Sequence, residues 1–428
     1  MKETKFKQTD IGLIPEDWKI DILDKAFQFL PTNTYAREFM DEKTGDVHNI
    51  HYGDILVKYG SIVDFERDSV PYLKQSVDSG DERNYLKNGD LIIADTAEDE
   101  TAGKTVEIFN LGGKKAVAGL HTFACRPKID FASKYLGFFS NCAFFHNQML
   151  PYFTGTKVTS ISKSCIKKIF VTYPSSKDEQ ERIANALSQV DDLLAALDEQ
   201  IEKKQLVKQG AMQQLLTGKT RLQGFRGEWK TVKLGEIGNT FNGLSGKSAV
   251  DFGTGNAKYV TFLNVLNNPI IDTSILENVN INLGEKQNAV HKGDLFFNTS
   301  SETPEEVGIC AVILEEIKNL YLNSFCFGFR LFDENVDGKY LAFYFRSKTG
   351  RDLMTTLAQG ATRYNLSKSA FDKSEITIPS TLAEQQAIAN ILSTMDDEIQ
   401  ALQEERDKYA LVKQGMMQQL LTGKIRLK

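Results

Sequence analysis

One stretch of the chain occurs twice, and this duplication constrains the fold more than any other feature. Residues 206–222 read LVKQGAMQQLLTGKTRL, and residues 411–427 read LVKQGMMQQLLTGKIRL. The offset of 205 residues holds without a gap back to Gly155 and Gly360. Roughly half of the positions in this window are identical, which a chance match between two helices would not give. The chain is therefore an internal duplication.

The repeated stretch ends a longer segment with the apolar spacing of a helix. Apolar residues recur at steps of four and three, which places one narrow seam on each helix. The seam residues are Ile183, Leu187, Val190, Leu194, Leu197 and Ile201 in the first copy, and Ile388, Leu392, Met395, Ile399 and Leu402 in the second. Pro174 and Pro379 precede the segments, and Gly218 and Gly423 follow them, as is typical of helix boundaries. The roughly 38 residues between these signals predict a helix of about 57 Å.

A narrow seam requires one partner helix, and the other copy can supply it. The alternative is a pair of unrelated surface helices, but the two seams agree in register. A domain of about 160 residues has a radius of gyration near 15 Å, so it bridges neighbouring helix ends but does not run back along a long helix. The helices should therefore pair antiparallel, with one domain at each end and a pseudo-two-fold axis across the middle.

The two globular segments follow one plan with different residues. Trp18 in PEDWKIDIL corresponds to Trp229 in GEWKTVKLGEIG, and each segment then offers short β-rich runs, a helical patch, a polar segment and a last strand. In the first segment, residues 49–59 and 85–95 are expected to form strands. The predicted domains are residues 1–177 and 223–382, and the predicted spacer helices are residues 178–222 and 383–428. The predicted fold class is α+β, with two pseudo-symmetric globular α/β domains separated by two long antiparallel coiled-coil helices.

The composition bounds the class of protein. With 428 residues, of which 41% are hydrophobic and 25% charged, the chain can bury more than one core. No apolar run is long enough to span a bilayer and no apolar signal core opens the chain, so we expect a cytoplasmic protein without a membrane segment. The five cysteines are scattered without a CxxC pair, which favours free thiols over structural zinc.

The charge argues against a free-standing nucleic-acid-binding protein, which usually has a basic footprint. The net charge is −6. Residues 1–177 contain 23 Lys and Arg against 24 Asp and Glu, and residues 223–382 contain 16 against 18. Contact with DNA would therefore require a local basic patch, or a partner that supplies much of the phosphate contact.

Motifs of catalysis and cofactor binding are not found in the sequence. Residues 102–105 (AGKT) and 245–248 (SGKS) imitate a phosphate-binding loop, but the glycine that the full motif requires is replaced by Glu98 and Phe241. The five histidines lack the spacing of metal ligands, and the carboxylates form no defensible acid–base pair. We therefore expect a non-catalytic protein without a cofactor or metal.

Several motifs together resemble the specificity subunit of type I restriction–modification enzymes. They are IPEDWK near the start, GTKVTSISKSCIKKIFVTYPSSKDEQERIA, its counterpart GATRYNLSKSAFDKSEITIPSTLAEQQAIA, and the twin helix ends. The resemblance covers essentially the whole chain. One departure is the proline-rich segment before each helix, which is reduced here to residues 173–175 and 378–380.

The resemblance implies a function for both repeated parts. In that family, two target-recognition domains each read half of a split DNA sequence. The helices hold the domains apart and dock two adenine methyltransferase subunits, and motor–nuclease restriction subunits join later. Two alternatives are a self-sufficient restriction or methylation enzyme, which would need a catalytic motif, and a coiled-coil adaptor that binds proteins only. Divergent domains on common helices favour readers of different half-sites, so the DNA site should be asymmetric.

The candidate site residues lie in two kinds of segment. Residues 154–164 and 359–369 are polar, loop-like and equivalently placed, which suits DNA contact, although they could equally be ordinary connecting loops. The candidate DNA-binding residues are Lys157, Thr159, Ser162, Lys163, Arg363, Tyr364, Asn365, Ser367 and Lys368. The candidate partner-binding residues, identical in both helices and off the seam, are Lys208, Gln209, Gln213, Gln214, Lys413, Gln414, Gln418 and Gln419, with Lys219 and Lys424 beyond them.

Overall fold

The computed structural model describes residues 4–77 and 80–427. The chain folds as two compact units. Unit 1 consists of Met1–Asp198 and Glu405–Lys428, and unit 2 consists of Glu199–Glu404. Each unit therefore contains one globular domain together with a part of each long helix.

Unit 1 is built on a five-stranded sheet with the strand order β4-β13-β9-β11-β7. The strands are β4 (Phe27–Leu30), β13 (Thr122–Pro127), β9 (Leu91–Ala94), β11 (Thr105–Phe109) and β7 (Ile62–Asp64). Only β7 runs parallel to its neighbour. Both faces of the sheet are covered, because Leu91 and Ile93 pack into one core while Ile92 and Ala94 pack into another. A second sheet has the order β12-β6-β8-β5 and consists of β12 (Lys115–Ala118), β6 (Val47–Ile50), β8 (Tyr72–Leu73) and β5 (Met40–Asp41).

The strand expected over residues 49–59 is wrong for most of its length. Strand β6 ends at Ile50, and helix α2 (Tyr52–Val57) follows it. The helix begins there because the His51 Nδ1 accepts a hydrogen bond from the Gly53 N–H at 3.2 Å. The apolar spacing of this short run fits a strand or two turns of helix, and the cap decides between them.

Unit 2 repeats the central sheet of unit 1. Its strand order β17-β24-β20-β22 corresponds to β4-β13-β9-β11. The strands are β17 (Gly238–Asn242), β24 (Cys326–Leu331), β20 (Leu295–Asn298) and β22 (Cys310–Val312). A second sheet of unit 2 contains β19 (Glu277–Val279), β18 (Phe252–Val260) and β23 (Leu320–Leu322). The expected helical patches are confirmed as α3 (Tyr135–Phe139) and α4 (Ala143–His146) in unit 1, and as α9 (Gly338–Arg346) and α10 (Lys348–Leu357) in unit 2.

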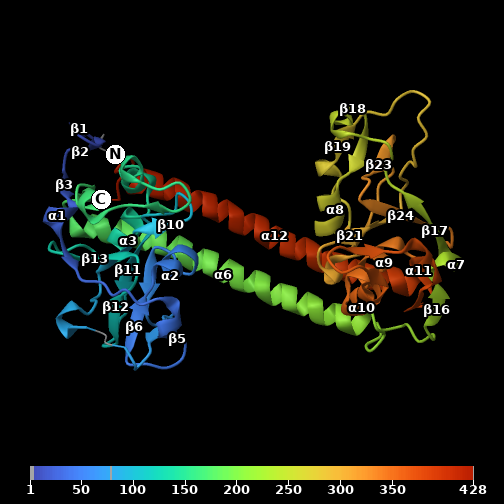
Figure 1. The fold of residues 1–428 in the computed structure, drawn as a ribbon, viewed down its shortest axis with the longest axis horizontal. Helices are drawn as coiled ribbons and strands as arrows, with labels where there is room; N and C mark the ends of the chain where they lie inside the picture. The colour runs from blue at the N-terminus through green and yellow to red at the C-terminus, as the bar shows by residue number, and fades with distance from the viewer. Residues whose placement is uncertain (1–3, 78–79, 428) are drawn as a thin grey trace. The chain divides into compact units, whose positions relative to one another are not determined.

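The two long helices are α6 (Lys177–Leu215) and α12 (Leu382–Leu420), drawn in green and red in Figure 1. They run antiparallel within each unit. In unit 1, Asp191 pairs with Lys413 and Asp198 pairs with Arg406, so the residue numbers rise on α6 as they fall on α12. In unit 2, Lys204 pairs with Glu398 and Lys208 pairs with Asp396, so the residue numbers again rise on α6 as they fall on α12. No helix of the described residues is both long and apolar enough to cross a membrane.

The repeated helix ends are fixed to the domains by the same contacts in both units. In unit 1, Arg426 forms a bidentate ion pair with the buried Glu179, and its guanidinium lies 5.8 Å from the ring centre of Trp18. In unit 2, Arg221 makes the same contacts with Glu384 and with Trp229, again at 5.8 Å. We call this contact of an arginine with a buried glutamate and a tryptophan the arginine clamp. It accounts for the arginine that follows each long helix.

Candidate functional site

The two polar segments predicted as loops are short hairpins, closed in unit 1 by the bridge between Thr154 and Ser160, so the loop prediction holds for the turns and is wrong only for the few strand residues. In unit 1, β14 (Thr159–Ser160) pairs with β10 (Thr96–Ala97). In unit 2, β26 (Tyr364–Leu366) pairs with both β21 (Ser300–Ser301) and β25 (Ala358–Gln359). Short strands among polar residues leave little periodicity to detect. They form here in small separate sheets, through pairing with β10 and β21, which follow β9 and β20 in the chain.

A glycine at the same place fixes the turn of each hairpin. Gly155 has φ +106° and Gly360 has φ +141°, a region that side chains rarely allow. A Cβ atom at Gly155 would lie 1.9 Å from the Val158 carbonyl oxygen, and one at Gly360 would lie 2.1 Å from that of Arg363. Both hairpins therefore share one backbone geometry, and the remaining positions are free to carry different side chains.

The candidate residues that differ between the copies lie on these hairpins. Lys157 and Arg363 are exposed in the two turns. Thr159 lies in β14, while Tyr364 and Asn365 lie in β26 opposite Ser301 and Ser300. The structure thus places them together, unit by unit, on a surface rich in hydrogen-bonding groups.

The shared serines have a structural role that the sequence did not indicate. Ser162 caps α5 (Lys163–Ile166) by accepting a hydrogen bond from the Cys165 N–H at 3.3 Å. Ser367 caps α11 (Lys368–Lys373) by accepting one from the Ala370 N–H at 3.4 Å. Because a cap accounts for a serine in both copies, their identity does not by itself indicate phosphate contact.

The shared lysines are held over aromatic rings. The Lys163 ammonium lies 5.3 Å from the ring centre of Phe29, and that of Lys368 lies 5.6 Å from the ring centre of Phe327. Lys368 also donates a hydrogen bond to the side-chain oxygen of Asn242. Burial lowers the pKa of the Lys368 ammonium. These contacts position each lysine beside its hairpin.

The hairpin segments themselves are basic, although the strands that pair with them are followed by exposed acidic residues, Glu98, Asp99 and Glu100 in unit 1 and Glu302, Glu305 and Glu306 in unit 2. Residues 154–168 contain four lysines and no carboxylate. Residues 359–373 contain Arg363, Lys368 and Lys373 against a single carboxylate, Asp372. The positive charge available for contact with a polyanion is thus confined to the hairpin segments.

Two of the candidate partner-binding residues are engaged within the chain. Lys208 pairs with Asp396 and lies 5.6 Å from the ring centre of Phe343. Lys413 pairs with Asp191 and lies 5.7 Å from the ring centre of Phe138. Contacts between the helices and with the adjacent domain thus explain why these lysines are the same in both copies.

Other identical residues of the two helices are exposed. They include the candidates Gln209, Gln213, Gln214, Gln414 and Gln418, whereas Gln419 is half-buried. Sequence reasoning missed two apolar pairs beside them: Leu206 and Val207 are 59% and 60% exposed, and Leu411 and Val412 are 69% and 43% exposed. The signal available in the sequence was that these apolar residues lie off the seam yet are identical in both copies.

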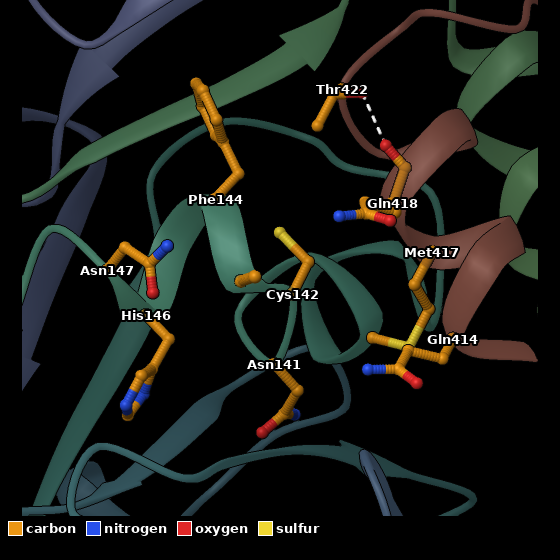
Figure 2. Close-up of a pocket in the computed structure, with 10 residues that line it drawn as sticks. Asn141, Cys142, Phe144, His146, Asn147, Gln414, Met417, Gln418 and Thr422 are labelled. Carbon is orange, nitrogen blue, oxygen red and sulfur yellow. Dashed lines mark hydrogen bonds between the residues drawn. The ribbon is translucent and has the colours of Figure 1, made fainter. Parts of the chain in front are cut away.

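A pocket of about 290 Å³ lies beside the end of α12 in unit 1. Figure 2 shows Gln414, Met417 and Gln418 of α12 on one side of it, and Cys142 and Phe144 on the other. In unit 2, Thr349 takes the place of Phe144 and Asp352 takes the place of Asn147. Part of the repeated helix surface therefore has a different neighbourhood in the two units.

Four of the cysteine thiols are buried and have raised pKa values. Burial raises the pKa of Cys142 to about 11 and that of Cys326 to about 12. It also raises the pKa values of Cys125 and Cys310. Within residues 4–77 and 80–427, no three His, Cys, Asp or Glu side chains gather as a metal site would require.

Comparison with known families agrees with this architecture. Residues 37–205 and 226–408 both match the model of the type I restriction modification DNA specificity domain. Because the two matches cover most of the chain, it belongs to the family of type I restriction–modification specificity subunits, with two DNA-recognition domains. The family resemblance predicted from the motifs is confirmed.

Individual relatives and solved structures span the chain. A protein of Methanocaldococcus jannaschii assigned as the MjaX specificity subunit is 25% identical over 454 residues, covering 100% of this chain and 98% of its own length. The type I restriction enzyme MjaVIII specificity subunit of the same organism is 26% identical over 304 residues, covering 64% of this chain and 66% of its own. The crystal structure of a type I S subunit from M. genitalium aligns with a TM-score of 0.56 at 15% identity, covering 97% of this chain and 98% of its own. The predicted fold class, α+β with repeated domains and long antiparallel helices, is confirmed.

Proposed function

We propose that the chain reads an asymmetric, bipartite DNA sequence and binds two adenine methyltransferase subunits, through which restriction subunits join. In this proposal residues 1–177 and 223–382 are the two readers, and residues 178–222 and 383–428 are the spacers that dock the partners. The chain itself is non-catalytic, needs no cofactor and acts in the cytoplasm.

One observation carries the proposal: the two hairpins share a backbone geometry but differ in their exposed side chains. Gly155 and Gly360 fix the same turn, while Lys157 corresponds to Thr362 and Val158 to Arg363. Base edges in the major groove are read by side-chain donors, acceptors and apolar groups, so different side chains on one frame suit different half-sites. Two identical readers related by a two-fold axis would instead demand a palindrome.

The helix surface supports the second part of the proposal. Domains that read different sequences need not share surfaces, but identical partners would require identical docking residues. The exposed identical residues Leu206, Val207, Leu411 and Val412 meet this requirement. A surface of apolar residues between glutamines is typical of a protein interface rather than of contact with a polyanion.

The proposal is tested by sequencing modified adenines in the DNA of cells that carry the whole system. We expect one split, asymmetric motif, with modified adenines on opposite strands about a helical turn apart. Arg363→Ala should relax recognition in one half-site only, because Arg363 is exposed in the turn of a single hairpin. Lys157→Ala, in the exposed turn of the other hairpin, should affect only the other half-site.

Three results would contradict parts of this proposal. A palindromic motif would overturn the reading by two different domains. The absence of any motif would favour an adaptor that binds proteins only. Equal loss at both half-sites in Arg363→Ala would show that this residue acts in folding or assembly.

A further inference from the structure

Beyond the two hairpins, each unit exposes a ring at one equivalent position next to the hairpin. In unit 1 this residue is His121, which directly precedes β13. In unit 2 it is Phe325, which directly precedes β24. The Phe325 residue is 60% exposed and the His121 side chain is 47% exposed.

The backbone around this position is the same in both units. In unit 1, the Asp95 N–H donates to the His121 carbonyl at 3.0 Å, and the Ile161 N–H donates to the Asp95 carbonyl at 2.9 Å. In unit 2, the Thr299 N–H donates to the Phe325 carbonyl at 2.9 Å. The Leu366 N–H then donates to the Thr299 carbonyl at 2.9 Å. Positions 121 and 325 are thus joined to the hairpins by the same two hydrogen bonds.

The side chains on this common frame differ in chemistry. The His121 Nδ1 lies 3.3 Å from an oxygen of Asp95, which also accepts a hydrogen bond from the Thr96 hydroxyl at 2.7 Å. In unit 2 the residue in place of Asp95 is Thr299, whose hydroxyl donates to the Phe325 carbonyl at 2.7 Å. Unit 1 therefore presents the polar imidazole of His121, oriented by Asp95, whereas unit 2 presents the apolar phenyl ring of Phe325.

We propose that positions 121 and 325 are base-reading positions, and that Phe325 recognises thymine through its C5 methyl group. This inference rests on the proposed function. A surface that served a partner common to both repeats would keep its residues, as the long helices do, whereas this one changes from His to Phe. The thymine methyl is the one apolar group on the major-groove edge of the bases, and phenylalanine is a suitable contact for it.

The neighbours of Phe325 fit this role. Asn365 is exposed on β26, opposite Ser300, which follows Thr299 in the chain. An asparagine amide can make two hydrogen bonds with adenine in the major groove, so Asn365 and Phe325 together suit the two bases of A·T pairs. His121, held by Asp95, instead offers a polar contact, so unit 1 should discriminate at its own position by hydrogen bonding.

The test uses the complete modification complex and duplexes of the motif found in modified host DNA. Each thymine of the motif is replaced in turn by deoxyuridine, which lacks only the methyl group. The wild-type complex should bind about fourfold more weakly when one thymine of one half-site is replaced, as expected for a buried methyl group. Phe325→Ala should bind the unmodified motif more weakly and should not respond to that replacement.

Phe332→Ala is the matched control. Phe332 is 56% exposed and follows the opposite end of the same strand, β24, away from the hairpin. This variant should keep the wild-type response to deoxyuridine. His121→Ala, on the same duplexes, should change base discrimination only in the half-site that Phe325→Ala leaves intact.

Several outcomes would overturn the inference. One is a wild-type complex that does not respond to deoxyuridine at any thymine, and another is a Phe325→Ala complex that responds as the wild type does. Loss of methyltransferase binding in Phe325→Ala, without any deoxyuridine effect, would assign the ring to a protein contact. If the wild-type complex shows no sequence preference at all, the proposed function fails together with the inference.

Discussion

At the scale of single residues, Glu107 shows that the two domains use different side chains to accept hydrogen bonds from the first N–H groups of equivalent helices. Its carboxylate is buried in β11 and accepts hydrogen bonds from the Lys134 N–H at 2.6 Å and the Gly137 N–H at 2.8 Å, at the start of α3. The corresponding residue in unit 2 is Val312, and there Asp337 caps α9 by accepting a hydrogen bond from the Tyr340 N–H. In unit 1 the start of α3 is therefore capped by a strand residue, Glu107, rather than by a residue that directly precedes the helix.

This arrangement predicts a pH dependence of stability. Burial raises the pKa of Glu107 to about 7, although the Gly137 and Lys134 N–H groups oppose the shift. Because the folded-state pKa is raised above the ordinary value, this carboxyl group contributes stability that is fully present at acid pH. That contribution is lost as the pH rises from about 4.5 to about 7, and it amounts to on the order of 3 kcal/mol.

Glu107→Gln should remove this dependence. Unfolding by urea at several pH values would show the difference in unfolding free energy between wild type and variant shrinking or reversing toward pH 8. The difference is the informative quantity, because buried histidines also titrate, and burial lowers the pKa values of His48, His51 and His146. A difference that stays constant with pH would contradict the prediction.

At the scale of elements, the sequence predicted the long helices well and the short strands poorly. Helices α6 and α12 carry long apolar repeats, and Gly218 and Gly423, both with φ +69°, end them as expected. Strands β14 and β26 span two and three residues, so their existence depends on the neighbouring strands β10 and β21 rather than on their own pattern.

The sequence predicted the position of the two hairpins in the candidate site but not the position of His121 and Phe325. The ungapped offset of 205 residues located both hairpins, because they lie at its upstream end. Residues His121 and Phe325 lie outside that window, at an offset of 204, among divergent residues. Their equivalence is shown by the structure, through the hydrogen bonds to Asp95 and Thr299 and through their place directly before β13 and β24. Lys208 and Lys413 were predicted to bind partners because they are identical in both helices and lie off the seam. The sequence could not show their ion pairs with Asp396 and Asp191, which join residues far apart in the chain.

Two glycines within the long helices support a further prediction. Gly210 lies in α6 and Gly415 at the equivalent place in α12, and a Cβ atom at either would meet nothing within 4 Å among the described residues. Replacing an exposed helical glycine with alanine stabilises a helix by about 1 kcal/mol. Gly210→Ala with Gly415→Ala should therefore raise the unfolding free energy of the isolated chain by about 2 kcal/mol.

The same double variant should weaken methyltransferase binding, because glycine at both places suits close approach of a partner. Native mass spectrometry should give one specificity chain with two methyltransferase subunits for the wild type, and incomplete complexes for the variant. Gln205→Ala is the control, since the equivalent residue is already Ala410. Unchanged complex formation by the double variant would place the docking surface elsewhere.

At the scale of the whole molecule, each half of the duplication is completed by the other. The end of α12 and Arg426 pack into the core of unit 1 beside Trp18, and the end of α6 and Arg221 pack into unit 2 beside Trp229. Neither domain therefore folds against its own helix alone. This exchange explains why the helix ends have stayed alike while the surfaces of the domains have diverged, since both ends must fit the same kind of clamp.

Both long helices continue from one unit into the other, at Asp198–Glu199 in α6 and at Glu404–Glu405 in α12. Inserting seven residues at each of these two points would keep the apolar seams in register, because the seam repeats every seven residues. Each helix would lengthen by about 10 Å, which is the rise of about three base pairs of B-DNA. We therefore expect the unread gap of the DNA motif to lengthen by about three base pairs while both half-sites keep their sequences.

Sequencing of modified adenines measures both the gap length and the half-site sequences. An insertion in one helix only should abolish modification, because it breaks the register of the seam. An unchanged gap in the doubly extended variant would show that the helices do not set the distance between the half-sites.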